Sequence, residues 1–321
     1  MSTVPSSIIL WVGMDVHKES ITVAVFRERE SEPLRVDRVV NDDRKLRRYF
    51  ERLGRDGEVR ACDEAEERVR DLVRCRETFQ REIIKSRHYI LKFLRRRGFI
   101  YREGTHWTTR HMNWIRQVLM PDRLAAEDRA VLAEYFALLE YKLGRRGELD
   151  RRIEELALTP RYAPVVERIG CFRGFKIQAA MVLATEIGDV RRFESPRQLM
   201  AYLGLVPGEH ASGERRRTGS ITKAGNARVR HVLVQAAWSA RKRPTVGAAL
   251  RKRQAGQDPQ VIAHAWKCQH RLYKLFHRLA ARKPTQVAAV AVAHEMVGFL
   301  WAVLRDLNPS YLEPEEVSHA A

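Results

Sequence analysis

The chain is poor in the residues that build disulfide frameworks and zinc sites. It has four cysteines in 321 residues, and none of them forms a Cys-x-x-Cys pair. These cysteines are Cys62, Cys75, Cys171 and Cys268. Their wide spacing argues against a disulfide scaffold and against a structural zinc site. The sequence therefore indicates a protein of a reducing compartment.

Signals for export or membrane insertion are also missing. The N-terminal stretch "MSTVPSSIILWVGMDVHKES" has no basic start, and Asp15 interrupts its short apolar run, so it does not resemble a signal peptide. No apolar run reaches the roughly 18 residues that a helix needs to cross a bilayer. We therefore expect a cytoplasmic protein without membrane association.

Acidic residues are in the minority. The chain has 40 Asp and Glu against 59 Lys and Arg, which gives a net charge of +19. A charge that high favours a polyanionic partner such as nucleic acid, and the alternative is a basic ribosome-associated or merely soluble protein. Hydrophobic residues make up 45% of the chain, which suffices for cores in two domains.

Residues 8–65 have the pattern of an α/β domain. The runs "IILWVGMDVHK", "SITVAVFRE" and "PLRVDRVVN" predict three strands, and the first is nearly continuous, as in a strand buried on both faces. Asn41 and Asp42 can cap a following helix, which Gly54 is expected to end. The predicted buried face of that helix consists of Leu46, Tyr49, Phe50 and Leu53. The stretch "EVRACDEA" then predicts a fourth strand.

The rest of the chain has helical periodicity. Two charged helical stretches within 66–158 predict an antiparallel hairpin, interrupted by "GTHWTTRHMNW", which would serve as a dimerisation arm, a nucleic-acid arm or both. The stretch around Gly170 and Gly174 resembles a helix-hairpin-helix that can hold a phosphate, although a simple packing turn explains it equally well. Three histidines are spaced unlike a metal pair and are expected to be surface or packing residues. They are His264, His270 and His277.

Two acids suggest a metal site. Asp15 lies near the middle of the first predicted strand, where a buried carboxylate is costly unless it is paired or binds a metal. Glu64 stands at the end of the fourth predicted strand. In an RNase H-like fold these strands are neighbours, so the two acids would face each other and chelate Mg²⁺ for phosphodiester chemistry. The alternative is that Asp15 caps a turn and Glu64 starts a helix.

A second candidate site is the polar, Gly-rich loop and helix "GLVPGEHASGERRRTGSITKAGNARVRHVL". Its cations would surround a phosphate and stabilise the charge that develops there under attack. They are Arg215, Arg216, Arg217, Lys223, Arg228 and Arg230. Ser212 is a small hydroxyl beside them, and Ser220 and Thr222 compete with it. The pattern alone does not separate a nucleophile from a passive phosphate ligand.

Three stretches carry a family resemblance. "GMDVHK", the long segment "GDVRRFESPRQLMAYLGLVPGEHASGERRRTGSITKAGNARVRHVLVQAAW" and the late "VAVAHEMVGFLWAVL" together resemble the DEDD transposases of the insertion-sequence one-ten family, the bridge-RNA-guided serine recombinases of mobile elements. "RVRDLVRCRE" resembles the start of that family's helical hairpin. The C-terminal match covers about half of the chain, and its long ordered motif is specific.

The resemblance implies a fold that is α/β plus all-α. It comprises a RuvC-like domain of the RNase H type over 8–65, a coiled-coil hairpin over 66–158, a mainly helical C-terminal transposase domain over 160–306 and a tail over 307–321. It also implies that Asp15 and Glu64 bind Mg²⁺, that Ser212 links covalently to DNA, and that the partners are DNA, a guide RNA and further copies of the chain.

The chain departs from the family pattern in one place. The family follows its second acid with further strands and an Asp-x-x-Asp helix, whereas here "RACDEA" runs directly into "EERVRDLVRCRE". We interpret this junction as an internal deletion that shortens the RuvC-like domain and removes two of four metal ligands. Mg²⁺ is then expected to bind weakly. Other acids that could substitute are Asp63, Glu66 and Glu67.

Three functions therefore remain open from the sequence. The first is a transposase that cuts and rejoins DNA through a serine and Mg²⁺-binding acids. The second is a catalytically dead remnant that binds DNA or RNA. The third is a RuvC-like resolvase that uses metal alone. The sequence does not decide whether this copy is active.

Overall fold

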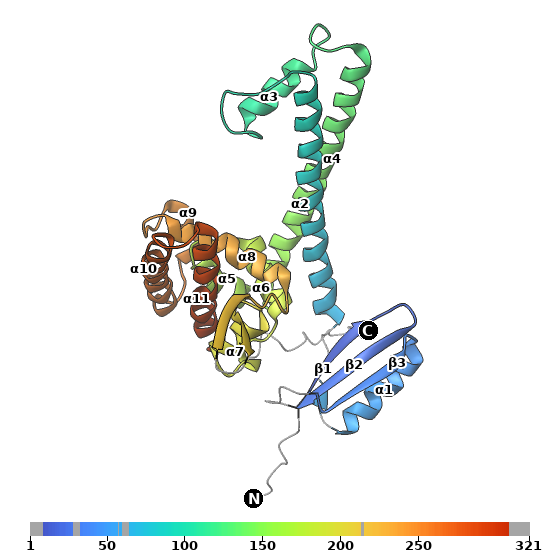
Figure 1. The fold of residues 1–321 in the computed structure, drawn as a ribbon, viewed down its shortest axis with the longest axis vertical. Helices are drawn as coiled ribbons and strands as arrows, with labels where there is room; N and C mark the ends of the chain where they lie inside the picture. Colours follow the sequence, from blue (N-terminus) through green and yellow to red (C-terminus); the bar gives the residue numbers. More distant parts are fainter. Residues whose placement is uncertain (1–8, 28–32, 57, 60–63, 213–214, 308–321) are drawn as a thin grey trace, which may run out of the picture. The chain divides into compact units, whose positions relative to one another are not determined.

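A computed structural model describes residues 9–27, 33–56, 58–59, 64–212 and 215–307 (Figure 1). The chain divides into two compact units, Met1–Glu67 and Arg68–Ala321. The predicted domain boundary at 65 lies close to this division, whereas the predicted boundary near 159 falls inside the second unit.

The first unit contains a four-stranded sheet and one helix. Their bounds are β1 (Ile9–Val16), β2 (Ser20–Arg27), β3 (Arg35–Val40), α1 (Asp43–Asp56) and β4 (Glu58–Val59). The strand order is β3-β2-β1-β4, with β1 antiparallel to β2 and parallel to β4. This order confirms the predicted succession of elements and the predicted pairing of the first and fourth strands.

Helix α1 covers one face of this sheet (Figure 1). Ile21, Val23 and Val25 of β2 are buried against Tyr49 and Leu53 of α1, as the helical spacing predicts. The predicted cap also forms, because the Asp42 carboxylate accepts a hydrogen bond from the Lys45 backbone N–H at 3.0 Å. The helix was expected to stop at Gly54 but continues to Asp56. No neighbour lies within 4 Å of that glycine, so nothing forces a turn there.

The expectation that the first strand is buried on both faces is wrong. Met14 is 55% exposed, and Gly13 is also exposed. In the described part of this unit, α1 is the one helix that packs on the sheet. Gly13 pairs with Ala24 on the face away from α1, whereas Met14 pairs with Val23 on the side of α1 and is still not covered. Val36 and Val40 of β3 are exposed as well.

The predicted hairpin follows, and the second unit begins within its first helix. Helices α2 (Glu64–Arg96) and α4 (Ala126–Ala157) lie side by side in Figure 1. Polar pairs connect them along their length, and the residues of each helix follow one another in opposite order, which confirms the antiparallel arrangement. These pairs are Arg76–Asp150, Gln80–Arg146, Ser86–Lys142 and Arg97–Asp128.

The far end of the hairpin has its own core. Ile83, Ile90 and Leu94 of α2 and Leu132 and Leu139 of α4 are fully buried in it. Val131 and Leu138 stand next to these two leucines in the sequence, but each is 42% exposed. A helix of 3.6 residues per turn rotates neighbouring positions by about 100°, so only one member of each adjacent pair faces the core.

The interrupting stretch contains a third helix that periodicity did not predict. Helix α3 (Thr109–Val118) begins at Thr108, whose hydroxyl accepts a hydrogen bond from the His111 backbone N–H. Ile115 of α3 is buried in the core of the hairpin end. The helix is short and rich in aromatic and polar residues, so it gives a weak helical pattern in the sequence.

His111 is a fully buried polar residue of this end. Its ring is fully buried among Tyr101, Trp107 and Trp114, and its Nδ1 accepts a hydrogen bond from the Trp107 backbone N–H at 3.0 Å. Its Nε2 has no partner in the described part of the chain. Burial, and secondarily the charge of His106, lower the pKa of His111 from 6.5 to about 4.

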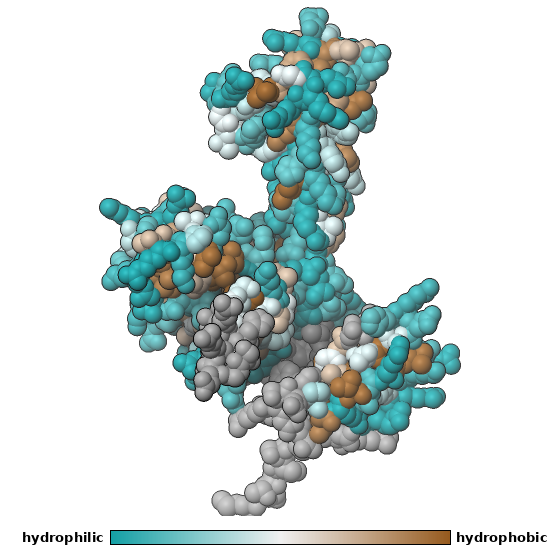
Figure 2. Space-filling model, in the orientation of Figure 1, coloured by the Kyte–Doolittle hydropathy of each residue, from teal (hydrophilic) through white to brown (hydrophobic). Residues whose placement is uncertain are grey.

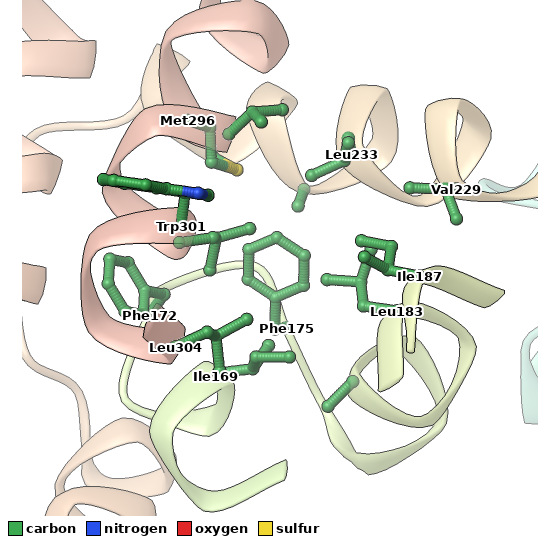
Figure 3. Packing of buried hydrophobic residues seen from close by; sticks show 14 of the residues in the cluster. Ile169, Phe172, Phe175, Leu183, Ile187, Val229, Leu233, Met296, Trp301 and Leu304 are labelled. Carbon is green, nitrogen blue, oxygen red and sulfur yellow. The ribbon is translucent and has the colours of Figure 1, made fainter. Parts of the chain in front are cut away.

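The remaining elements form the largest core of the molecule. They are α5 (Ala163–Gly170), α6 (Ile177–Ile187), η1 (Val190–Arg192), α7 (Pro196–Tyr202), β5 (Pro207–Ser212), β6 (Arg215–Ile221), α8 (Ala227–Ala237), η2 (Trp238–Arg241), α9 (Ala248–Gln254), α10 (Pro259–Ala280) and α11 (Thr285–Arg305). Figure 3 shows Phe175 surrounded by side chains of α5, α6, α8 and α11. The Trp301 indole N–H donates to the Phe193 carbonyl at 3.0 Å, which satisfies the buried polar end of that side chain.

Helix α11 corrects the expectation that no segment could span a membrane. By length and composition it is apolar enough to do so. Its side chains, however, belong to the core: Ala288, Val292, Met296 and Leu300 are all buried. A core helix passes the same test as a membrane helix because both present apolar residues on most of their surface.

The turn between α5 and α6 supports the packing interpretation of the glycine pair. Gly174 has a φ of +100°, and a Cβ there would lie 2.8 Å from the Ala236 carbonyl oxygen of α8. The glycine therefore allows the turn to lie against that helix. The histidines of α10 also pack as expected: His264 lies against Phe299, and His277 lies against Tyr273.

We predict that the hairpin end loses stability as the pH falls from 6.5 towards 4. In that range the unfolded chain binds a proton at His111 and the folded chain does not, so protonation favours unfolding by roughly 3 kcal/mol at most. Denaturation by urea between pH 4 and 7 measures this effect. His111→Asn should flatten the profile, and the exposed His88→Asn should not; equal profiles for both variants would contradict the prediction.

Candidate functional site

The stretch that carries Ser212 is a β-hairpin, not the loop that its polar composition predicts. Strands β5 and β6 pair in antiparallel register. Ser212 ends β5 and pairs with Arg215 at the start of β6, and the next pair is Ala211 with Arg216. The hairpin thus brings the candidate nucleophile and the arginine run together across two strands as well as along the chain.

The two competing hydroxyls lie elsewhere on this hairpin. Ser220 is exposed in the second half of β6, and Thr222 follows that strand. The Thr222 backbone N–H donates to the Val206 carbonyl at 2.9 Å, so both ends of the hairpin are tied together at its base. Ser212 lies at the opposite end, which separates it clearly from both competitors.

Two glycines close the base of the hairpin. Gly204 and Gly225 have φ values of +63° and +69°, and a Cβ on either would collide with the backbone of the facing segment. Gly204 faces Ala224, and Gly225 faces the Tyr202 carbonyl. The segments before and after the hairpin therefore approach each other more closely than any side chain permits.

A buried carboxylate joins the base of the β5–β6 hairpin to helix α2. Glu186 of α6 accepts two hydrogen bonds from the Arg74 guanidinium of α2, at 2.8 and 3.2 Å. Its second oxygen also accepts from the Asn226 side-chain amide at 2.6 Å. Asn226 in turn caps α8, because its side-chain oxygen accepts the backbone N–H groups of Arg228 and Val229.

The Glu186 side chain is 2% exposed, so its charge depends on these partners. Burial alone would raise its pKa, but the hydrogen bonds from Arg74 and Asn226 and the nearby positive charges outweigh burial and hold the pKa below its ordinary value. Glu186 is therefore ionised at neutral pH. The sequence analysis missed this residue because one acid near the end of an apolar helix looks like an ordinary helix terminus.

The structure separates the six cations predicted to bind nucleic acid into three groups. Arg228 donates to the Glu77 carboxylate of α2 at 2.9 Å. Arg230 donates to the Leu203 and Gly225 carbonyls at 3.0 and 3.1 Å. These two guanidinium groups therefore have intramolecular partners, and their role in phosphate binding stays a prediction.

Lys223 differs from these two arginines. It is exposed and has a φ of +57°, which is unusual for a residue other than glycine. The three remaining cations lie on β6, and their side chains are outside the described part of the structure. They are Arg215, Arg216 and Arg217. Contact of these four cations with nucleic acid also stays a prediction.

The two candidate metal ligands belong to the first unit. Asp15 lies on β1, where its backbone pairs with Thr22 of β2. The fourth strand ends at Val59, and Glu64 is the first residue of α2, so the alternative that Glu64 starts a helix describes its local structure. Among the described residues, no three His, Cys, Asp or Glu side chains gather as a metal-binding group.

We predict that Gly225→Ala destabilises the second unit by roughly 3 kcal/mol. The substitution adds left-handed backbone strain and a clash with the Tyr202 carbonyl. Gly147→Ala is the matched control, because Gly147 lies inside α4 with nothing within 4 Å, and alanine there should stabilise by about 0.5 kcal/mol. Thermal denaturation of both variants measures these changes in stability. An unchanged stability of Gly225→Ala would show that the close approach of the two segments is not required.

Glu186→Gln should destabilise the same unit by about 2–3 kcal/mol, since it leaves the Arg74 charge without its buried partner. The loss should be smaller in acid. The folded-state pKa of Glu186 lies below its unfolded value, so its contribution is present at neutral pH and disappears as the pH falls through the folded value. Urea denaturation at pH 7 and pH 4 measures both effects, with the exposed Glu155→Gln as control.

Comparison with known proteins shows that this part of the chain matches a family model. Residues 167–252, which include α6, the β5–β6 hairpin and α8, match the family described as Transposase IS116/IS110/IS902 family. The chain is 37% identical over 259 residues to y4qE of Sinorhizobium fredii, a protein named as a transposase. The match covers 79% of this chain and 62% of that protein.

Two further relatives carry the names of insertion elements. The transposase for insertion sequence element IS1533 of Leptospira borgpetersenii is 22% identical over 85% of this chain and 97% of its own length. The transposase for IS1111A of Coxiella burnetii is 27% identical over 47% of this chain and 36% of its own length. By this segment and these relatives, the chain is similar to transposases of the IS116/IS110/IS902 family.

Proposed function

We propose that the chain derives from a recombinase that cuts and rejoins DNA at the ends of an insertion element, with Ser212 as nucleophile. The observation that carries this proposal is the β5–β6 register, which sets Ser212 opposite Arg215 inside the family segment 167–252. A serine at the free end of a hairpin, anchored at its base by Gly204, Gly225 and the Glu186 network, can reach a DNA backbone from a firm support.

The proposed reaction conserves the number of phosphodiester bonds. The Ser212 hydroxyl loses its proton, and its oxygen forms a bond to a DNA phosphorus. The bond from that phosphorus to one deoxyribose oxygen breaks, and this oxygen takes up a proton. Attack of a deoxyribose hydroxyl of another strand then releases the serine and joins the new pair of strands. Arg215 to Arg217 would neutralise the charge that develops on the phosphoryl oxygens.

The described acids do not supply a complete metal site. In the proposed ancestor, Asp15 and Glu64 would belong to a RuvC-like set of four Mg²⁺ ligands. In this chain β4 ends at Val59 and α2 begins at Glu64, and the sequence between them contains no Asp-x-x-Asp of the family pattern. We therefore propose that an internal deletion has left this copy unable to cleave DNA by itself.

The partners follow from the same proposal. DNA is the substrate, and the net charge of +19 supports a polyanionic partner. A guide RNA and further copies of the chain belong to the proposal through the family resemblance. The match to this chain spans 62% of the length of y4qE.

The test is a search for a covalent protein–DNA adduct. The chain is incubated with Mg²⁺, transcripts from the flanks of its element and DNA of the element ends, and is then denatured and resolved on a gel. The unaltered chain should give no adduct. A version with a family-like segment inserted after Ala65 should give one, because it regains the missing acids.

Three variants of the restored version identify the nucleophile. Ser212→Ala should abolish the adduct and leave DNA affinity nearly unchanged, and Ser220→Ala should have little effect. Arg216→Ala should weaken both. An adduct that survives Ser212→Ala and disappears with Ser220→Ala would move the nucleophile to the second serine. Cleavage without any adduct would favour a resolvase that uses metal alone.

A further inference from the structure

The far end of the hairpin carries an open groove of unusual composition. It lies on the surface of α2 and α4 and is lined by two aromatic and three basic side chains, with no carboxylate among them. These residues, which we call the tyrosine groove, are Tyr89, Lys92, Arg95, Arg96 and Tyr135. We propose that the tyrosine groove binds single-stranded nucleic acid, with one base stacked on Tyr89.

The two rings differ in how firmly they are held. Tyr135 is half-buried and meets the buried Phe93 edge-on at 6.0 Å between ring centroids. Tyr89 lies 6.1 Å from Tyr135 but is 52% exposed. Tyr135 thus supports Tyr89 from the core side, while the ring of Tyr89 faces water. An exposed ring on a firm support offers a flat apolar surface to an unpaired base.

The cations of the groove have no ion-pair partners in the described part of the chain. This is unlike their neighbours, because Arg97 donates twice to Asp128 and Lys85 pairs with Glu82. Lys92 and Arg96 follow Tyr89 at spacings of three and seven, so they share its side of the helix. Their charges remain available for phosphates next to a stacked base.

The composition argues for single strands over a duplex. In a duplex the faces of the bases are already covered by stacking on one another. The ring of an exposed tyrosine therefore cannot stack on them and would not contribute to binding. Positive charges are favourable near the C-terminus of a helix, and this alone would account for Arg95 and Arg96. It does not account for the exposed ring of Tyr89 beside them. A second copy of the chain is disfavoured, since three unpaired positive charges would face an identical surface.

The test measures binding of the full chain to fluorescent oligonucleotides of about 12 nucleotides by anisotropy. Single-stranded RNA, single-stranded DNA and duplex DNA of one sequence are compared. Tyr89→Leu should weaken binding of single strands roughly 5- to 50-fold and leave duplex binding unchanged. Tyr141→Leu is the control, because Tyr141 is 62% exposed on α4 outside the groove. A preference for RNA or for DNA identifies the source of the strand.

A second pair of variants tests the phosphate contacts. Arg95→Gln with Arg96→Gln should reduce the salt dependence of single-strand binding, by about 0.7 in the log–log slope for each phosphate contact that is lost. Arg151→Gln with Arg152→Gln removes the same charge from exposed positions at the other end of α4 and should change the slope less. Light scattering shows whether Tyr89→Leu alters the oligomeric state.

Three results would overturn the proposal. One is a Tyr89→Leu effect no larger than that of Tyr141→Leu. Another is an equal loss of duplex binding, which would make the groove a site for the phosphate backbone alone. The third is dissociation of an oligomer by Tyr89→Leu, which would make the groove a contact between copies. None of these readouts depends on a covalent adduct, so the proposal for Ser212 can fail independently.

Discussion

The second unit depends on one buried ionised group, the carboxylate of Glu186. An isolated carboxylate in that position would cost several kcal/mol, so it requires partners on every side. It obtains them from Arg74 of α2 and from Asn226 at the start of α8. A single side chain thereby fixes three helices against one another. The base of the β5–β6 hairpin follows directly, because Asn226 comes immediately after Gly225.

This arrangement divides the arginines of the basic stretch into two sets. Arg228 and Arg230 lie on α8, close to the buried carboxylate network, and their guanidinium groups complete the bonding of neighbouring segments. Arg215 to Arg217 lie on β6, beyond the tied base of the hairpin. The run of positive charge in the sequence therefore combines a supporting part on α8 with a part on β6 for which we propose contact with DNA, and only the fold distinguishes the two.

The long helices were predictable because apolar residues recur along them at helical spacing, and the polar turns around β2 marked the strands of the first unit. The β5–β6 hairpin was not, since arginine and glycine obscure the alternation that signals a strand. Helix α3 was too short for periodicity to detect. Of the site, Ser212 and the arginines came from residue type and family resemblance. Glu186 depends on Arg74, more than one hundred positions away, and local patterns do not reveal such a pairing.

The place of α11 in the core has a consequence for synthesis of the chain. The helix occupies 285–305 and fills the space between α5, α7, α8 and α10. While the ribosome is still producing the earlier helices, their apolar faces have no cover, and the native core cannot close until α11 has emerged. The second unit therefore folds late in translation. A nascent chain that stops before Thr285 would expose a large apolar surface to chaperones and proteases.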